Sequence, residues 1–126
     1  MNKYLKKVKP RNRYREFLRV LNGNLFLTER ELQVMTLLIK LDVEWQPVFE
    51  GEVKNVNSTI SRKTVMKETR INKNNLTKYI KFLKDKGLLI DNGEDGLVVN
   101  PMFLPKETDN KIEVLFTLDF SEDGTN

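Results

Sequence analysis

The stretch TRINKNNLTKYIKFLKDKGLLIDNGEDGLVVNP, residues 69–101, contains a helix pattern followed at once by a hairpin pattern. Three apolar residues recur at positions i, i+4 and i+7: Leu76, Ile80 and Leu83. This spacing places them on one face of an α-helix, with Tyr79 and Phe82 flanking it. We therefore predict an amphipathic helix over residues 73–86.

Residue types at both ends of this helix support its boundaries. Asn72 can accept a hydrogen bond at the helix start, and Gly87 suits the left-handed position that ends a helix. Two short apolar runs follow, at 88–90 and 97–99, and they predict two strands. The segment 91–96 between them contains an Asn-Gly and an Asp-Gly pair, which favour a tight turn.

Residues 111–120 alternate between apolar and other side chains. One face would carry Ile112, Val114, Phe116, Leu118 and Phe120. A period of two predicts a strand. It is either a third member of the sheet or an edge that binds a partner.

A shorter helix is predicted just before this stretch. Ser61 suits the N-cap of a helix from 62 to about 69, with Val65 facing inward. Residues 70–72 then form a turn in which Ile71 points into the core.

The N-terminal half contains two further helix patterns. Four residues at i, i+3, i+4 and i+7 predict a helix over 14–21: Tyr14, Phe17, Leu18 and Leu21. Asn22-Gly23-Asn24 is expected to stop or bend the chain. An Asn-Gly hairpin is the alternative here, and the spacing of three to four residues favours the helix.

Thr28 and Glu31 have the spacing of a capping box, which predicts a helix that fades near Asp42. Its inward residues are Leu32, Val34, Met35, Leu38, Ile39 and Leu41. Residues 43–57 fit a short strand or an irregular loop. Two aromatic residues there are expected to cap the core rather than bind a partner: Trp45 and Phe49.

The chain of 126 residues is long enough for one domain of mainly α structure with a small β-sheet, an α+β class. We expect a basic flexible arm at 1–13, a domain at 14–120 and a disordered tail at 121–126. No apolar run approaches the roughly 20 residues that span a bilayer, and no signal peptide is recognisable. We therefore expect a cytoplasmic protein without membrane contact.

The residue types that are missing restrict catalysis. The chain has no cysteine and no histidine, which removes thiolate chemistry and the commonest acid–base group and zinc ligand. No paired-acid motif, phosphate-binding loop or nucleophile elbow is present. We expect no enzyme activity, cofactor or metal, although a carboxylate–metal site stays open as a third hypothesis.

Charge is strongly segregated along the chain. Residues 1–20 hold eight basic side chains and one acidic side chain, and residues 58–86 hold nine and two. Residues 87–126 hold two basic and nine acidic side chains. Two basic blocks of this kind favour a polyanionic partner. The alternative is that these charged side chains only contribute to the general solubility of the protein.

The predicted order of helix, helix, short helix, three-residue turn, helix and hairpin resembles a winged helix-turn-helix domain. Residues 58–101 carry the resemblance. The run LIDNGEDGLVVNPMF is similar to the wing of RepL-type plasmid replication initiators and of small phage winged-helix proteins, as is the pair LTERELQVMTLLI and ISRKTVMKETRINKNNLTKYIKFLKDKGLLI. The resemblance implies a two-stranded wing, to which 111–120 adds a C-terminal strand.

In this family the helix at 73–86 would enter the major groove of DNA. The side chains outside its apolar stripe are types that contact base edges: Lys73, Asn74, Asn75, Thr77, Lys78 and Lys81. The alternative is a solvated helix face in a chain that is rich in lysine and asparagine.

Two other groups of basic residues are candidates for contact with the nucleic-acid backbone. The supporting helix would offer phosphate contacts from Arg62, Lys63, Lys67 and Arg70. The arm would follow phosphates or enter a minor groove with Lys3, Lys6, Lys7, Lys9, Arg11, Arg13 and Arg15. RNA, an acidic protein or no partner are the alternatives for the arm.

The wing departs from the family pattern at its tip, which holds Asp91, Glu94 and Asp95 where Lys or Arg is common. Acids repel phosphates, so we expect this hairpin to face away from DNA or to bind a protein. The leading hypothesis is a DNA-binding protein of a phage or mobile element, acting in transcription regulation or replication within a bacterial host. The alternative is a protein-interaction or virion-associated module. A homodimer is expected to be compatible with either.

Overall fold

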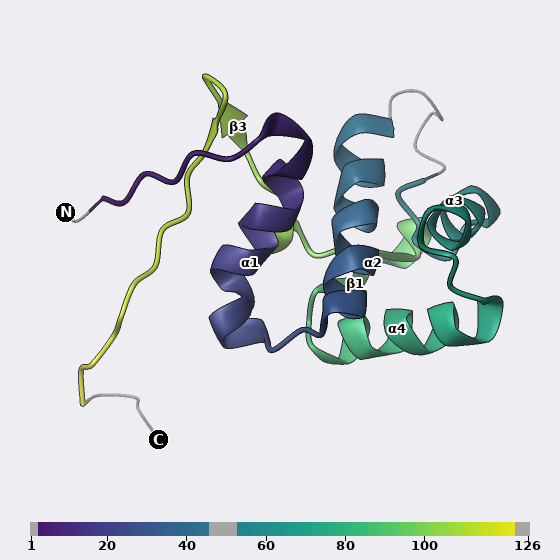
Figure 1. Cartoon of the computed structure of the whole chain (residues 1–126). Helices are drawn as coiled ribbons and strands as arrows, with labels where there is room; N and C mark the ends of the chain where they lie inside the picture. Colours follow the sequence, from purple (N-terminus) through teal and green to yellow (C-terminus); the bar gives the residue numbers. More distant parts are fainter. Residues whose placement is uncertain (1–2, 46–52, 123–126) are drawn as a thin grey trace.

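The computed structural model describes residues 3–45 and 53–122. Within them the chain forms four α-helices and two small antiparallel sheets (Figure 1). The helices are α1 (Arg13–Leu25), α2 (Glu29–Lys40), α3 (Thr59–Thr69) and α4 (Lys73–Asp85). The strands are β1 (Leu89–Asp91) with β2 (Leu97–Val99), and β3 (Glu107–Thr108) with β4 (Lys111–Ile112). This arrangement confirms the α+β class.

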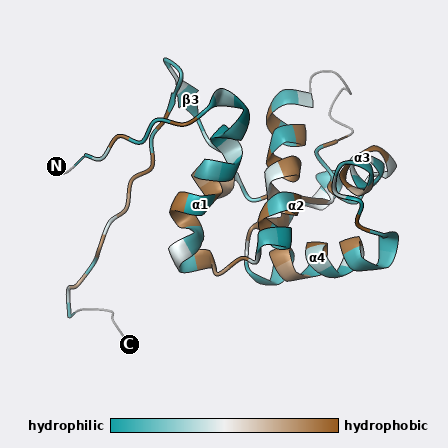
Figure 2. Ribbon diagram, in the orientation of Figure 1, coloured by the Kyte–Doolittle hydropathy of each residue, from teal (hydrophilic) through white to brown (hydrophobic). Residues whose placement is uncertain are grey.

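The apolar faces of the helices meet in one core. α1 and α4 both contact α2, and α3 contacts α2 and α4 (Figure 1). The largest fully buried side chains on the helices include Leu18, Leu32, Met35, Ile39, Leu76 and Leu83. Figure 2 shows the apolar residues of α2 and α4 on the faces that meet. The faces predicted from helical spacing are therefore the faces that the fold buries.

Three predicted helix boundaries are confirmed by specific hydrogen bonds. At the start of α2, the Glu31 backbone N–H donates to the Thr28 hydroxyl, and the Thr28 N–H donates to the Glu31 carboxylate, which completes the capping box. At the start of α4, the Asn75 N–H donates to the Asn72 side chain at 2.8 Å. After α4, Gly87 has φ +83°, which a glycine adopts readily.

The expected stop at Asn22-Gly23-Asn24 is wrong by a few residues, and the hairpin alternative is wrong altogether. α1 continues through these residues to Leu25 and ends where Phe26 takes a left-handed conformation at φ 54°. The Asn22 side chain instead bonds the backbone of Leu27, accepting from its N–H at 2.8 Å and donating to its carbonyl at 3.2 Å. Packing of α1 on α2 outweighs the low helix preference of Asn and Gly.

Ser61 is not the N-cap of α3. Ser58 holds that position and accepts from the Ser61 N–H at 3.2 Å. Ser61 is buried in the first turn, where its hydroxyl donates to the Val53 carbonyl at 2.9 Å. Both serines fit a cap by residue type, and the tertiary contact with Val53 decides between them.

The predicted hairpin forms from β1 and β2, with Leu89 opposite Val99 and Asp91 opposite Leu97. β1 begins one residue later than predicted, because the Leu88 N–H donates to the Leu83 carbonyl in the turn that ends α4. The predicted strand at 111–120 is largely wrong. Its first two residues pair as β4, and 113–120 have no regular secondary structure.

The segment after α2 also differs from expectation. A π-helical turn, Leu41–Trp45, extends α2 past the point where it was predicted to fade. Trp45 is 37% exposed and lines a surface hollow together with Leu37 and Leu41, and its role as a cap of the core stays a prediction. Phe49 lies outside the described residues, as do residues 1–2 of the predicted arm and 123–126 of the predicted tail. No helix in the described ranges has the length and apolar character needed to cross a bilayer.

Candidate nucleic-acid interface

α3 and α4 are joined by a turn whose geometry is set by a buried threonine. The Thr69 hydroxyl donates to the Val65 carbonyl at 2.6 Å and accepts from the Ile71 N–H at 3.2 Å. Arg70 between them is left-handed, with φ 58°, and Ile71 is buried. The turn is thus anchored on both sides, and α4 starts in a defined direction.

The candidate base-contacting residues all lie on exposed parts of α4: Lys73, Asn74, Asn75, Thr77, Lys78 and Lys81. Leu76, Ile80 and Leu83 turn the opposite face into the core. Residues at i, i+4 and i+7 share a face, so Asn74, Lys78 and Lys81 form one stripe along the exposed side. The predicted division of this helix into a buried and an exposed face is confirmed.

Two of the candidates bond each other. The Arg62 guanidinium on α3 donates to the Thr77 hydroxyl at 2.8 Å and to the Lys73 carbonyl at 3.2 Å, and the Thr77 hydroxyl donates to that same carbonyl at 3.0 Å. Arg62 therefore braces the first turns of α4 against α3. Its role in the free protein is structural, as is that of the Thr77 hydroxyl.

Six cationic side chains on this unit are exposed and form no ion pair with any described residue. We refer to them as the α3–α4 basic surface: Lys63, Lys67, Arg70, Lys73, Lys78 and Lys81. Later in the same block, Lys84 pairs with Asp91 at 3.0 Å and Lys86 pairs with Glu31 at 3.3 Å. Uncompensated charge is therefore concentrated on α3 and most of α4.

Arg30 is an addition that the sequence did not indicate. It lies in the first turn of α2, yet its guanidinium donates to the Thr69 carbonyl at 3.1 Å, beside Arg70. Arg30 forms no ion pair with the described part of the chain. No local pattern could have linked it to residues about forty positions away, because only the packing of α2 on α3 brings them together.

The arm candidates divide into two groups. Lys6 pairs with Glu16 at 2.8 Å, Arg15 pairs with Glu29 at 3.3 Å, and Arg13 pairs with both Glu44 and Glu107. Arg13 also begins α1 rather than ending the arm. The remaining arm cations are exposed and have no ion pair with a described residue: Lys3, Lys7, Lys9 and Arg11.

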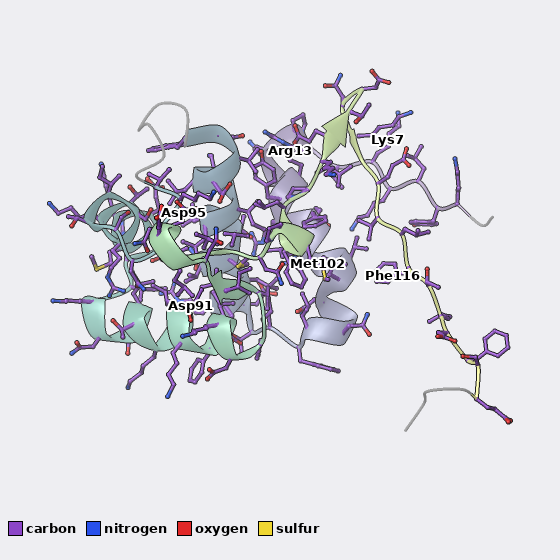
Figure 3. All side chains as sticks on the ribbon, turned by 180° about the vertical axis from the view of Figure 1, so that it is seen from behind. Lys7, Arg13, Asp91, Asp95, Met102 and Phe116 are labelled. Atoms are coloured by element: carbon purple, nitrogen blue, oxygen red, sulfur yellow. The ribbon has the colours of Figure 1, made fainter. Side chains whose placement is uncertain are left out.

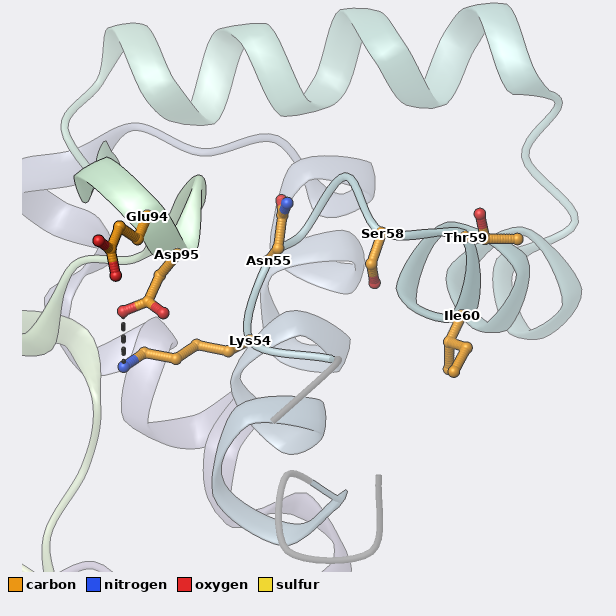
Figure 4. A pocket seen from close by; sticks show the side chains of 7 residues that line it. All are labelled: Lys54, Asn55, Ser58, Thr59, Ile60, Glu94 and Asp95. Carbon is orange, nitrogen blue, oxygen red and sulfur yellow. Dashed lines mark ion pairs between the residues drawn. The ribbon is translucent and has the colours of Figure 1, made fainter. Parts of the chain in front are cut away.

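The acidic tip of the β1–β2 hairpin is held by contacts of the Asp95 side chain. Asp95 pairs with Lys54 at 3.3 Å, as Figure 4 shows, and accepts from the Asn92 side chain at 3.1 Å. Gly96 has φ +73°, and a Cβ there would lie 2.7 Å from the Asn55 side chain, so the β1–β2 hairpin packs closely on the segment before α3. A backbone bond from the Val56 N–H to the Leu97 carbonyl, at 2.9 Å, fixes the same contact.

The hollow between the tip of the β1–β2 hairpin and the start of α3 is shallow and polar. Its lining includes Lys54, Asn55, Ser58, Glu94 and Asp95 (Figure 4). Among the residues that the structure describes, no three His, Cys, Asp or Glu side chains gather in a way that could hold a metal ion.

Comparisons of the chain with models of protein families, with curated proteins and with solved structures found no match in any of the three.

Proposed function

We propose that this chain binds duplex DNA as a winged helix-turn-helix protein, with α4 as the helix that enters the major groove. The proposal extends to a role in transcription regulation or replication of a phage or mobile element. The observation that carries it is the α3–α4 basic surface, in which six exposed cations lack an acidic partner among the described residues.

The size of α4 supports this mode of binding. Its 13 residues give a rod of about 20 Å, and a helix with side chains is about 10–12 Å wide, close to the roughly 12 Å width of the major groove. Asn74 and Asn75 lie in the first turn, where recognition helices meet base edges. The asparagine amide can accept from N6 of adenine and donate to N7, and the lysine ammonium can donate to O6 and N7 of guanine.

The bond between Arg62 and Thr77 supports a rigid presentation of that first turn. Lys63 and Lys67 lie one turn apart on the exposed side of α3, where phosphate contacts would set register without reading sequence. Two of the three acids at the wing tip form ion pairs, Asp95 with Lys54 and Asp91 with Lys84, which lessens their repulsion of phosphate. The tip itself offers no cation to DNA. The wing is therefore the weakest part of the proposed contact.

A salt titration of duplex binding, followed by fluorescence anisotropy, tests the proposal. If most of the six cations displace counterions, log K against log salt should have a slope of about −3 to −5. Submicromolar affinity at low salt is expected. A dissociation constant no better than micromolar that barely changes with salt would contradict the proposal.

Charge reversal then locates the surface. Lys73→Glu with Lys78→Glu should weaken duplex binding by at least about 100-fold at low salt. Lys106→Glu with Lys111→Glu is the matched control, because both lysines are exposed, lack an ion pair with a described residue and change net charge equally. Equal losses in the two variants would mean that net charge alone drives binding and that α4 has no special role.

A further inference from the structure

The segment 113–120, which we call the C-terminal arm, continues an amphipathic strand pattern past the edge of the molecule. Ile112 and Val114 pack on the core, and the next residues of the same stripe are increasingly exposed: Phe116 at 49%, Leu118 at 89% and Phe120 at 94%. The apolar face of this strand pattern is therefore covered by the core at its start, and it becomes increasingly exposed to solvent along the rest of the arm.

The backbone of the C-terminal arm is also without a partner in the described chain. β4 ends at Ile112, and no backbone hydrogen bond joins 113–120 to another described segment. Unpaired extended backbone beside an apolar stripe is a template for adding a strand. At about 3.3 Å per residue, eight residues could offer roughly 26 Å of edge.

A second extended segment has complementary properties. Residues 3–9, the N-terminal arm, have no regular secondary structure and expose Tyr4, Leu5 and Val8. Three of their lysines lack an ion pair with a described residue: Lys3, Lys7 and Lys9. The C-terminal arm instead carries acids, at Glu113 and Asp119. Each arm thus combines exposed apolar side chains with one sign of charge.

Both arms leave the helical body on the side of α1 that faces away from α2 (Figure 1). Figure 3 shows Lys7 on the N-terminal arm and Phe116 on the C-terminal arm, both on the same side of the molecule as α1. Within one copy, no backbone hydrogen bond joins the two arms. The Lys6–Glu16 pair at 2.8 Å holds the N-terminal arm to its own α1.

We propose that two copies of this chain associate by reciprocal exchange, the C-terminal arm of each pairing as a strand with the N-terminal arm of the other. The second copy is favoured as the occupant because it supplies opposite charge and exposed apolar side chains to both arms at once. A two-fold arrangement uses each arm once and closes on itself. This inference uses no residue of the α3–α4 basic surface. Lys3, Lys7 and Lys9 are also candidate nucleic-acid contacts, so association is measured without nucleic acid.

A pair of full-length charge variants tests the exchange by sedimentation in the absence of nucleic acid. One variant carries Lys3→Glu, Lys7→Glu and Lys9→Glu, so both of its arms are acidic. The other carries Glu113→Lys and Asp119→Lys, so both of its arms are basic. The unmodified protein should be dimeric, each variant alone should dimerise at least about tenfold more weakly, and an equimolar mixture should form the heterodimer.

Three outcomes would overturn the proposal. They are a monomeric unmodified protein across the concentration series, an N-terminal variant that still dimerises as the unmodified protein does, and a mixture that fails to restore association. A monomeric unmodified protein would mean that the arms pair within one chain or bind another partner. An N-terminal variant that dimerises normally would mean that the C-terminal arms pair with each other.

The apolar stripe provides a second measurement. Replacing Phe116, Leu118 and Phe120 by serine should weaken dimerisation at least tenfold, because the stripe would no longer be buried between copies. Leu115→Ser with Met102→Ser is the control, since both residues are exposed and lie off the stripe. An equal loss in the control would also contradict the proposal.

Discussion

The two basic blocks of this chain are similar in composition and different in use. Residues 1–20 hold eight cationic side chains, of which four form ion pairs: Lys6, Arg13, Arg15 and Arg19. Residues 58–86 hold nine, of which two pair with an acid of the described ranges, Lys84 and Lys86. Every residue of the second block lies in the described part of the chain.

The difference comes from the acids that the fold brings near each block. Acids from other parts of the chain meet the N-terminal block at Glu29, Glu44 and Glu107. Over most of their length, the exposed faces of α3 and α4 form no ion pair with an acid from elsewhere in residues 3–45 and 53–122. Similar runs of positive charge can thus form ion pairs within the fold in one place and an unpaired cationic surface in another. Substitutions in the two blocks test this contrast.

The largest effect is expected at Arg13. Its guanidinium bonds Glu44, Glu107 and the Pro10 carbonyl, and it stacks 4.5 Å from the centre of the Tyr14 ring. Arg13→Ala would leave two neighbouring acids unpaired, so we expect the free energy of unfolding to fall by about 2 kcal/mol, allowing for partial exposure. Denaturant unfolding measures it. Unchanged stability with a large loss of duplex binding would place Arg13 on the binding surface instead.

A smaller effect is expected at Lys86, which pairs with a buried acid. Glu31 is 4% exposed and accepts hydrogen bonds from Lys86 and from the Thr28 backbone. Burial alone would raise the pKa of Glu31, but those hydrogen bonds outweigh it and the pKa is lowered. Lys86→Met should therefore cost about 1–2 kcal/mol at neutral pH, against less than about 0.5 kcal/mol for Lys78→Met.

The pH dependence of the Lys86 effect follows from the lowered pKa of Glu31. A carboxyl whose pKa is lower in the folded state contributes stability above its unfolded pKa of about 4.3, and loses it as pH falls through the folded-state value. The deficit of Lys86→Met should shrink as unfolding is measured at progressively more acidic pH. A deficit that stays constant across this range would show that Lys86 acts through packing alone.

The smallest effect is expected from a single neutral substitution on the basic surface. Lys81→Gln removes one exposed charge that has no ion pair among the described residues. Stability should stay within about 0.5 kcal/mol, while the slope of log K against log salt becomes shallower by about one. Lys84→Gln is a comparison on the same helix, since Lys84 already pairs with Asp91. A slope that changes equally in both would indicate that pairing with an acid does not decide which lysines bind.

Some features of the fold could be predicted because their causes lie within a few residues of one another. The capping box at Thr28, the cap at Asn72 and the helix-ending Gly87 all act locally, and the structure confirms each. The stripe of Leu76, Ile80 and Leu83 depends only on helical periodicity, and so do the candidate contact residues on the opposite face.

Other features could not be predicted because distant residues decide them. By residue type, Ser58 and Ser61 are equally suited to cap α3. The hydrogen bond from the Ser61 hydroxyl to the Val53 carbonyl leaves Ser58 as the cap. Arg30 approaches Arg70 only through the packing of α2 on α3. The alternation at 111–120 indicates which side chains share a face, but a strand also needs a neighbour, and the described chain supplies one only as far as Ile112.

The amino-acid sequence by itself determined the helical faces, the caps at Thr28 and Asn72, and the β1–β2 hairpin, because these depend on period and on short-range hydrogen bonds. It also determined that positive charge gathers in two blocks. Only the tertiary structure decided which block forms ion pairs with described acids and which remains largely unpaired with them. It also decided where the C-terminal arm loses contact with the core. Ion pairs and strand pairs join residues far apart in the chain, so their presence depends on how the helices pack.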